Sequence, residues 1–214
     1  MIDTVIFDFD GTLVNTNDVI IDAWQHTYRH YINKEMPVDH ITKCFGEPLL
    51  ITMAREFPQV PPEESAEVYR SRQREMADDL VRILPGITKM LHAVKEAGYK
   101  MGVVTSRTTE STMFYMEKFG IADLFDALVS CDDTDKHKPD PEPLLLGLEK
   151  LGAEADKAIM IGDSPFDMKC ANNAGVRTGL VSWRIAGTEE ALAQCVINCI
   201  INEPEDLLKK IEAL

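Results

Sequence analysis

The hydrophobic and polar positions of this chain follow two different patterns, and the change between them falls near residue 85. The chain begins with the apolar run Val5-Ile6-Phe7, which is followed at once by the carboxylates of Asp8 and Asp10. An apolar run that breaks into charged residues and Gly11 predicts a buried strand that ends in a tight turn.

Residues 15–84 show no strand-like alternation. Apolar residues recur there at helical spacing, as at Val19, Ile20, Ala23, Trp24 and Tyr31. Breaks at residues 33–37, 46–48 and 58–62 divide this stretch into about four helices, and the last should run from about Pro62 to Leu80.

After Pro85, strand-like and helical patterns alternate. Short apolar runs predict strands at residues 100–105, 127–130, 158–161, 177–181 and 196–201. Helices are predicted at residues 87–98, 109–119, 141–151, 164–174 and 204–213. Strands separated by helices of this length predict an α/β fold with a parallel, doubly wound sheet, which binds ligands at the carboxyl ends of its strands.

The length of 214 residues is enough for one α/β core and a small accessory element. We expect a core of residues 1–14 and 85–214, interrupted by a helical domain at residues 15–84. The formal net charge is −14, so the average field repels polyanions and argues against nucleic acid or an anionic membrane as the main partner. A small phosphate substrate is still compatible, because a metal ion and one lysine can invert the local field.

No apolar run approaches the ~20 residues of a membrane span, and the N-terminus lacks a signal-peptide pattern, so we expect a cytoplasmic protein. The five cysteines are scattered without a C-x-x-C pair, which indicates neither a zinc site nor a disulfide framework. The expected oligomeric state is a monomer or a dimer.

Asp8 and Asp10 stand two positions apart, so on an ideal strand they share a face. Two carboxylates that close raise each other's pKa unless a cation lies between them. Mg²⁺ suits such a place, because it is usually held by one or two carboxylates together with water and substrate phosphate oxygens.

The predicted strand at residues 100–105 is followed by a candidate anion-binding corner. The hydroxyls of Thr105 and Ser106 stand there beside the backbone N–H groups of a helix start. An ordinary helix N-cap has the same sequence. Arg107 is a further phosphate-binding candidate, or an exposed arginine at a helix start.

Lys138 stands in the run K-H-K-P-D-P-E-P, where Pro139 and Pro141 would fix the loop that presents it. An ammonium beside a nucleophile neutralises charge on the carboxylate and on a phosphoryl group. Lys136 is the local competitor for this role.

Gly162 and Asp163 follow the predicted strand at residues 158–161, and Asp167 falls on the first turn of the next helix. Gly162 leaves room for a tight turn, Asp163 would complete the ligands of a metal ion, and Asp167 would be a direct or water-mediated ligand. Alternatively, Asp163 caps the helix and Asp167 only suits the helix dipole.

These four motifs, in order and over essentially the whole chain, resemble those of the haloacid dehalogenase superfamily of phosphotransferases. The resemblance implies a Mg²⁺-dependent phosphatase in which Asp8 is the nucleophile and Asp10 the general acid and base. It also implies catalytic roles for Thr105 and Lys138, phosphate binding by Gly11, Thr105, Ser106 and Lys138, and metal binding by Asp8, Asp10, Asp163 and Asp167. Residues 15–84 would be the superfamily's helical cap.

Substrate specificity should lie on this cap. The turn at residues 45–49 resembles the specificity loop of relatives with a four-helix cap, which points to Phe45, Gly46 and Glu47. Four arginines are cationic candidates for binding an acidic leaving group: Arg72 first, with Arg55, Arg70 and Arg74. A solvated helix surface is the alternative for all of them.

Across its length the chain looks most like the phosphoglycolate phosphatase branch. The segments N-T-N-D, K-P-D-P-E-P and S-W-R-I-A-G look like a bacterial subgroup assigned as inorganic pyrophosphatases. The expected substrate is a small phosphate monoester (phosphoglycolate-like) or pyrophosphate, hydrolysed through an aspartyl-phosphate intermediate. A sugar phosphomutase of the β-phosphoglucomutase type is the alternative. A response-regulator receiver and a phosphate-binding module without turnover are further ones, against which the helical insertion and the filled catalytic positions argue.

Overall fold

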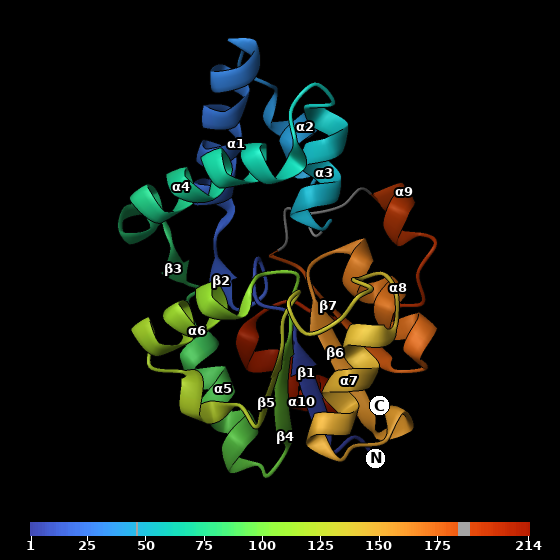
Figure 1. The fold of residues 1–214 in the computed structure, drawn as a ribbon. Coiled ribbons are helices and arrows are strands. Elements are labelled where there is room, and N and C mark those ends of the chain that lie inside the picture. Colours follow the sequence, from blue (N-terminus) through green and yellow to red (C-terminus); the bar gives the residue numbers. More distant parts are fainter. Residues whose placement is uncertain (46, 184–188) are drawn as a thin grey trace.

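The computed structural model describes residues 1–45, 47–183 and 189–214 (Figure 1). In these residues, six parallel strands form one sheet with the order β5-β4-β1-β6-β7-β8. The strands are β1 (Thr4–Phe7), β4 (Lys100–Val104), β5 (Ala127–Val129), β6 (Ala158–Gly162), β7 (Arg177–Val181) and β8 (Cys199–Ile201). The predicted α/β fold with a parallel sheet is confirmed.

Helices cover both faces of this sheet. They are α5 (Ile87–Glu96), α6 (Thr109–Lys118), α7 (Glu142–Leu151), α8 (Pro165–Ala174), α9 (Glu189–Leu192) and α10 (Leu207–Glu212), with 3₁₀ turns η1 (Ala122–Leu124), η2 (Ala155–Lys157) and η3 (Pro204–Asp206). The pattern did not predict α9, η1 or η2, which are too short for a helical period to show, and the helix predicted at residues 204–213 begins with the 3₁₀ turn η3. No helix in the described ranges is long and apolar enough to cross a membrane.

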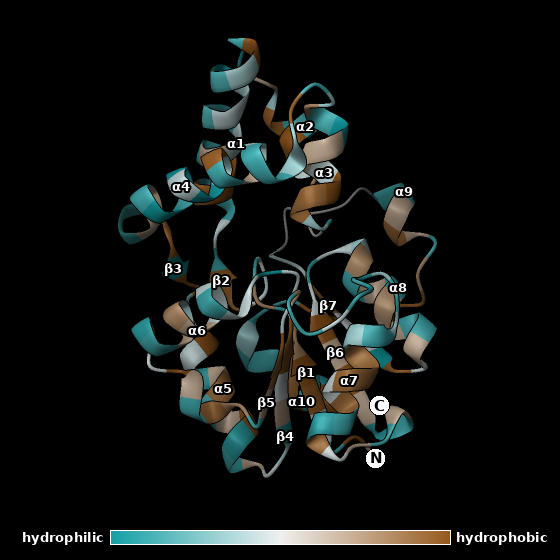
Figure 2. Cartoon of the chain, viewed as in Figure 1, coloured by the Kyte–Doolittle hydropathy of each residue, from teal (hydrophilic) through white to brown (hydrophobic). Residues whose placement is uncertain are grey.

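The side chains of β1 alternate between the two faces of the sheet. Val5 and Phe7 belong to an apolar core shared with α5, α6 and α10, and Ile6 belongs to a second core shared with α7 and α8. All four residues of β1 are buried, because both faces are covered. The strand therefore has the unbroken apolar sequence typical of a buried parallel strand, and Figure 2 shows the hydrophobic colour gathered on the central strands.

The last strand is shorter than predicted, since β8 begins at Cys199 and not at Val196. The backbone N–H of Val196 donates to Oδ1 of Asn172 (2.8 Å), and its carbonyl accepts from Nδ2 of Asn172 (3.0 Å) and from Oγ1 of Thr178 (2.8 Å). Side chains thus satisfy the backbone groups that a strand would pair in the sheet.

The four predicted helices between β1 and Pro85 are α1 (Asn17–Ile32), α2 (Val38–Thr42), α3 (Leu49–Glu56) and α4 (Pro62–Leu80). They lie beyond the end of the sheet at which β1 stops (Figure 1). They share an apolar core of their own, in which Trp24, Tyr28, Met53 and Phe57 are buried. The prediction of about four helices, the last from Pro62 to Leu80, is confirmed.

Two short strands connect this helical segment to the sheet. β2 (Val14–Asn15) and β3 (Arg82–Ile83) pair antiparallel, with Val14 opposite Ile83. They stand at the predicted boundaries of the helical domain, although the pattern did not reveal them. The division of the chain into core and cap domains stays a prediction.

Candidate active site

The predicted site residues meet at the carboxyl ends of β1, β4 and β6. β1 is paired with β4 on one side and with β6 on the other, where Phe7 is opposite Ile161. Asp8, Thr105 and Asp163 therefore follow three neighbouring strands at one edge of the sheet. The chain winds in opposite directions on the two sides of β1, and such a switch point is where open α/β sheets bind ligands.

The side chain of Lys138 lies buried at the centre of this edge. Its Nζ donates to Oδ1 of Asp8 (2.8 Å), to Oδ1 of Asp167 (2.6 Å) and to the carbonyl of Val104 (3.2 Å). Burial favours the neutral amine, but the carboxylates of Asp167 and Asp8 outweigh it and raise the pKa of Lys138. Lys138 is therefore a permanent positive charge bound to the predicted nucleophile.

The competitor Lys136 lies outside the site. Its ammonium is 3.6 Å from Asp140, and 67% of its side chain is exposed. The loop that carries both lysines has a cis peptide bond between Lys138 and Pro139. Nδ2 of Asn173 donates to the carbonyl of Pro139 (3.0 Å), so α8 holds this loop.

Asp8, Asp163 and Asp167 form a compact group of buried carboxylates, with ligand oxygens that all lie within 4.8 Å of one another. Burial, then repulsion from Asp167, raises the pKa of Asp8 to about 7 against the opposing effect of Lys138. Burial, Asp167 and Asp8 raise the pKa of Asp163 well above its usual range. Three carboxylates beside one ammonium place excess negative charge in a buried position, and a hard divalent cation would relieve it. The residues present therefore fit Mg²⁺.

The start of α8 fixes Asp167 in this group. Ser164 is the N-cap residue, and its Oγ accepts from the N–H of Asp167 (3.3 Å). In return, Oδ2 of Asp167 accepts from the N–H (3.0 Å) and the Oγ (2.6 Å) of Ser164, which completes a capping box. The alternative that Asp163 caps this helix is wrong. Asp167 serves both the helix and Lys138, since its Oδ1 faces the lysine.

Two glycines let the motifs pack together. Gly11 has a φ of 75°, and a Cβ atom added there would lie 2.3 Å from Oδ2 of Asp163. A Cβ atom on Gly162 would lie 2.5 Å from Cβ of Asp167. The glycines of the first and fourth motifs are thus required by close approach to the carboxylate group.

Arg107 makes an ion pair that the sequence did not reveal. Its Nη2 and Nε donate to Oδ1 (2.9 Å) and Oδ2 (3.1 Å) of Asp10, a bidentate arrangement. Its Nη1 donates to Oγ of Ser111 (2.6 Å), and its Cζ lies 5.1 Å from the ring centre of Tyr115. Only 9% of the Arg107 side chain is exposed. The alternative of an exposed arginine at a helix start is therefore wrong.

The carboxylate of Asp10 consequently lies with Arg107, and Asp10 is not a member of the group formed by the other three aspartates. Its assignment as a metal ligand stays a prediction. The two residues of the pair are 97 positions apart, so no local spacing in the sequence signals their contact.

Thr105 is buried at the end of β4, where its N–H donates to the carbonyl of Val129 (2.9 Å). Its Oγ1 accepts from the N–H of Arg107 (3.2 Å). The N-cap position of α6 is held by Thr108, so the alternative that Thr105 is an ordinary N-cap is wrong. Ser106 is half-buried between Thr105 and Arg107. The phosphate-binding roles of Thr105 and Ser106 stay predictions.

The predicted specificity residues of the helical segment are engaged with their neighbours. Glu47 accepts from Nη1 of Arg55 (2.7 and 2.9 Å) and from Oγ1 of Thr52 (2.9 Å). Phe45 packs against the apolar core of the segment. Gly46 lies outside the described residues, as do the last four residues of the S-W-R-I-A-G segment.

Three of the four candidate arginines are held by acidic residues: Arg55 by Glu47 (2.7 Å), Arg72 by Asp22 (2.6 Å) and Arg74 by Glu67 (2.5 Å). Arg70 is half-buried and, within the described residues, makes no hydrogen bond or ion pair. Burial raises the pKa of the Cys131 thiol to about 11, and the charge of Arg70 opposes this rise. Arg70 therefore lies near the carboxyl end of β5, beside the site.

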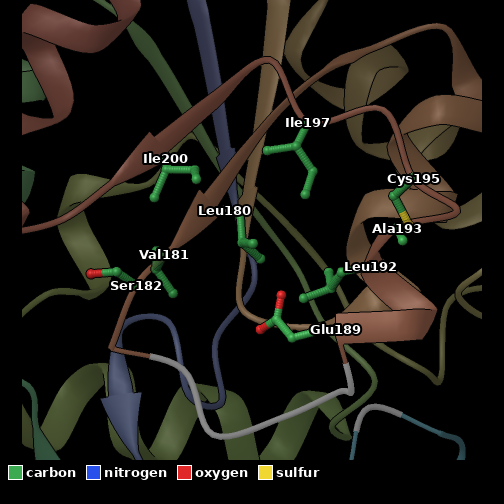
Figure 3. A pocket seen from close by; sticks show the side chains of 9 residues that line it. All are labelled: Leu180, Val181, Ser182, Glu189, Leu192, Ala193, Cys195, Ile197 and Ile200. Carbon is green, nitrogen blue, oxygen red and sulfur yellow. The ribbon is translucent and has the colours of Figure 1, made fainter.

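A cavity of about 830 Å³ lies elsewhere, between β7, β8 and α9 (Figure 3). Its walls are largely apolar, with Leu180, Leu192 and Ile197 among the lining residues. None of the predicted site residues lines it. The predicted catalytic residues therefore lie at the cluster of Asp8, Asp163 and Asp167 and away from this cavity.

Comparison with known proteins finds similar chains over almost the whole length of this one. A family model described as haloacid dehalogenase-like hydrolase matches residues 5–181. Pyrophosphatase PpaX of Halalkalibacterium halodurans is 35% identical over 207 residues, which cover 97% of this chain and 95% of the relative. Pyrophosphatase PpaX of Bacillus pumilus is 34% identical over 213 residues, which cover 100% of this chain and 94% of that relative.

Solved structures are similar over the same extent. A Lactobacillus plantarum protein assigned as a phosphoglycolate phosphatase has a TM-score of 0.87 at 26% identity, covering 98% of this chain and 99% of that one. β-Phosphoglucomutase of Clostridium difficile has a TM-score of 0.82 at 22% identity, covering 100% of this chain and 98% of that one. At that identity the second likeness concerns the fold alone.

Proposed function

Because the chain belongs to the haloacid dehalogenase-like hydrolase family and is a phosphatase, we propose that it hydrolyses pyrophosphate or a small, phosphoglycolate-like phosphate monoester with the help of Mg²⁺. The observation that carries the proposal is the position of Lys138, whose ammonium binds Asp8 and Asp167 at once within a group of buried carboxylates. Membership of a hydrolase family disfavours the receiver and the binding module without turnover.

Asp8 is the proposed nucleophile. Lys138 holds one of its oxygens and opposes the effect of burial, which by itself favours the acid form. An oxygen of Asp8 forms a bond to phosphorus while the bond from phosphorus to the leaving oxygen breaks, which gives an aspartyl-phosphate. Gly11, Thr105 and Ser106 are the proposed partners of the phosphoryl oxygens, at the edge of the sheet beside Asp8.

Asp8, Asp163 and Asp167 would hold Mg²⁺, because their buried oxygens lie together and their charge exceeds that of Lys138. When bound, Mg²⁺ supplies positive charge that offsets the charge of the phosphoryl oxygens. The ammonium of Lys138 also offsets the charge of the phosphoryl oxygens, and it belongs to the protein whether or not the metal is bound.

Asp10 is the proposed general acid and base. It gives a proton to the leaving oxygen in the first step. In the second step it takes a proton from the water whose oxygen attacks phosphorus, and the bond between phosphorus and Asp8 breaks. Phosphate is released and both aspartates return to their starting states.

The test is phosphate release from a panel of pyrophosphate, phosphoglycolate, nucleoside monophosphates and sugar phosphates, with Mg²⁺ and with a chelator. We expect Mg²⁺-dependent release with preference for pyrophosphate or phosphoglycolate, and no release by Asp8→Asn. Substantial turnover by Asp8→Asn, in a preparation free of host phosphatases, would refute the assignment of Asp8 as the nucleophile. Conversion of a sugar phosphate to its isomer without phosphate release would support the phosphomutase instead.

A further inference from the structure

The ion pair between Asp10 and Arg107 uses both carboxylate oxygens of Asp10. In the proposed reaction Asp10 must give a proton to the leaving oxygen, which requires one of its oxygens to face that atom. Each oxygen keeps a lone pair that Arg107 does not use, but a protonated Asp10 no longer carries the charge that pairs with the guanidinium. Proton transfer by Asp10 therefore works against the pair and favours its opening during the reaction cycle.

Asp10 is the partner that is free to move. The guanidinium of Arg107 is fixed by Ser111 and by the ring of Tyr115, and its side chain is 9% exposed. The side chain of Asp10 is 28% exposed and, within the described residues, is bound by Arg107 alone. When the pair opens, Arg107 stays in place as a buried cation in need of an anion.

We propose that Arg107 binds the anionic part of the leaving group, and that Asp10 occupies this position until the substrate arrives. This inference rests on the proposed function. A carboxylate or a phosphate matches the planar fork of a guanidinium as the Asp10 carboxylate does, so one bidentate anion replaces another. The exchange releases the Asp10 carboxylate, which takes up a proton from water and then gives it to the leaving oxygen, whereas a neutral leaving group offers Arg107 no replacement.

Two features of the surroundings support an anionic ligand here. Three N–H groups of Arg107 have acceptors in the described part of the chain, which leaves one N–H on each terminal nitrogen of the guanidinium for a ligand. Arg70 adds a half-buried positive charge that no acidic residue in the described ranges neutralises.

The substrate class follows from this geometry. A good substrate is a phosphoryl group joined to a leaving group that is itself a phosphate or carries a carboxylate. Sugar phosphates with neutral leaving groups are therefore expected to be poor substrates. Pyrophosphate and phosphoglycolate both meet the requirement. A matched neutral compound is 2-hydroxyethyl phosphate, in which a hydroxymethyl group takes the place of the carboxylate of phosphoglycolate.

The experiment measures kcat/KM of Arg107→Gln for pyrophosphate, phosphoglycolate and 2-hydroxyethyl phosphate. For the better anionic substrate we expect a fall of about 30-fold or more, the usual size for truncating one partner of a buried charged pair. For 2-hydroxyethyl phosphate we expect no fall, because Asp10 no longer has a competing partner. Arg29→Gln removes an arginine that is paired with Glu35 on the surface of α1, and it should change neither value.

An equal loss for anionic and neutral substrates would mean that Arg107 has a structural role only, and it would overturn the inference. If Arg107→Gln does not fold, Arg107→Lys is the second variant, because it keeps the charge but not the planar guanidinium. We then expect kcat/KM to fall about tenfold for the anionic substrate and to stay unchanged for 2-hydroxyethyl phosphate. Equal hydrolysis of phosphoglycolate and 2-hydroxyethyl phosphate by the wild-type enzyme overturns the inference and leaves the phosphatase intact. Absence of phosphate release from every compound overturns the proposed function itself.

Discussion

Gly11 faces Asp163 so closely that a Cβ atom on Gly11 would come within 2.3 Å of the carboxylate oxygen Oδ2. The first and fourth motifs, which are far apart in the sequence, meet through this position. Its φ of 75° is also one that side chains other than glycine rarely adopt.

Gly11→Ala should therefore displace Asp163 and lower kcat/KM by about 100-fold, since a shift of about 1 Å in a site can cost that much. Gly98→Ala is the matched control, because Gly98 has a φ of 84° with no atom within 4 Å of an added Cβ. Both variants should lose about 1 kcal/mol of stability through backbone strain. Phosphate release distinguishes them, urea unfolding checks that they lose stability to a similar extent, and full activity in Gly11→Ala would contradict the proposed packing.

Lys138→Met should abolish activity and lower the free energy of unfolding by about 3–5 kcal/mol, because it leaves buried carboxylates without their ammonium. Mg²⁺ should restore more stability to this variant than to the wild type, since the cation would replace the lost charge. Thermal unfolding with and without Mg²⁺ measures both effects. Lys136→Met, in the same loop but exposed, should behave as the wild type. Similar activity and stability of the two variants would contradict the assignment of Lys138 as the cation that neutralises the buried carboxylates.

The contribution of Asp8 to the stability of the chelator-treated protein should fall as pH rises from about 4 to about 7. Burial raises the pKa of Asp8 from 3.8 to about 7. A carboxyl group with a higher pKa in the folded state takes up protons on folding, so its stabilising effect is complete below pH 3.8 and is lost as pH rises through 7. The loss should be on the order of 2–4 kcal/mol.

The comparison that isolates Asp8 is the difference in unfolding free energy between the wild type and Asp8→Asn at each pH. Carboxyl groups away from the site whose pKa is lowered, such as that of Asp133, act in the opposite direction in both proteins and cancel. Asp8→Asn should become the more stable protein near pH 7 in chelator. A difference that does not vary with pH would mean that Asp8 titrates normally in the folded protein.

Asp163→Asn should weaken the response to Mg²⁺ by about tenfold or more, because changes to groups that only support metal ligands already cost that much. The measurement is a Mg²⁺ titration of phosphate release, with a parallel titration of the melting temperature. The exposed Asp123 provides the control as Asp123→Asn. An unchanged midpoint for Asp163→Asn in both titrations would exclude Asp163 as a ligand.

The sequence predicted those features whose signal is local or periodic. β1 was recognised because burial on both faces favours a run of consecutive apolar residues, here Val5-Ile6-Phe7. Asp8, Thr105 and Asp163 could be brought together because each follows a predicted parallel strand, and parallel strands end at one edge of the sheet. The choice of Lys138 over Lys136 came from the resemblance to the haloacid dehalogenase superfamily, in which the lysine stands before a proline.

Contacts between distant residues were beyond the sequence. The pairing of Arg107 with Asp10 depends on how the loop after β4 folds toward β1, and no periodicity encodes that. β2 and β3 are two residues long, which is too short for an alternating pattern to appear. Ser164 took the N-cap position because its side chain reaches Asp167, although Asp163 beside it is an equally good capping residue by type.

The pairing of Val14 with Ile83 has a consequence for how such a protein can change. The two ends of the helical segment lie side by side, about the distance between neighbouring strands apart. A different segment whose ends meet in the same way could be grafted at this point without any change in the sheet or in the aspartates behind it. Evolution can therefore exchange what covers the site while it keeps the chemistry, and the same junction is the natural place for an engineered chimera.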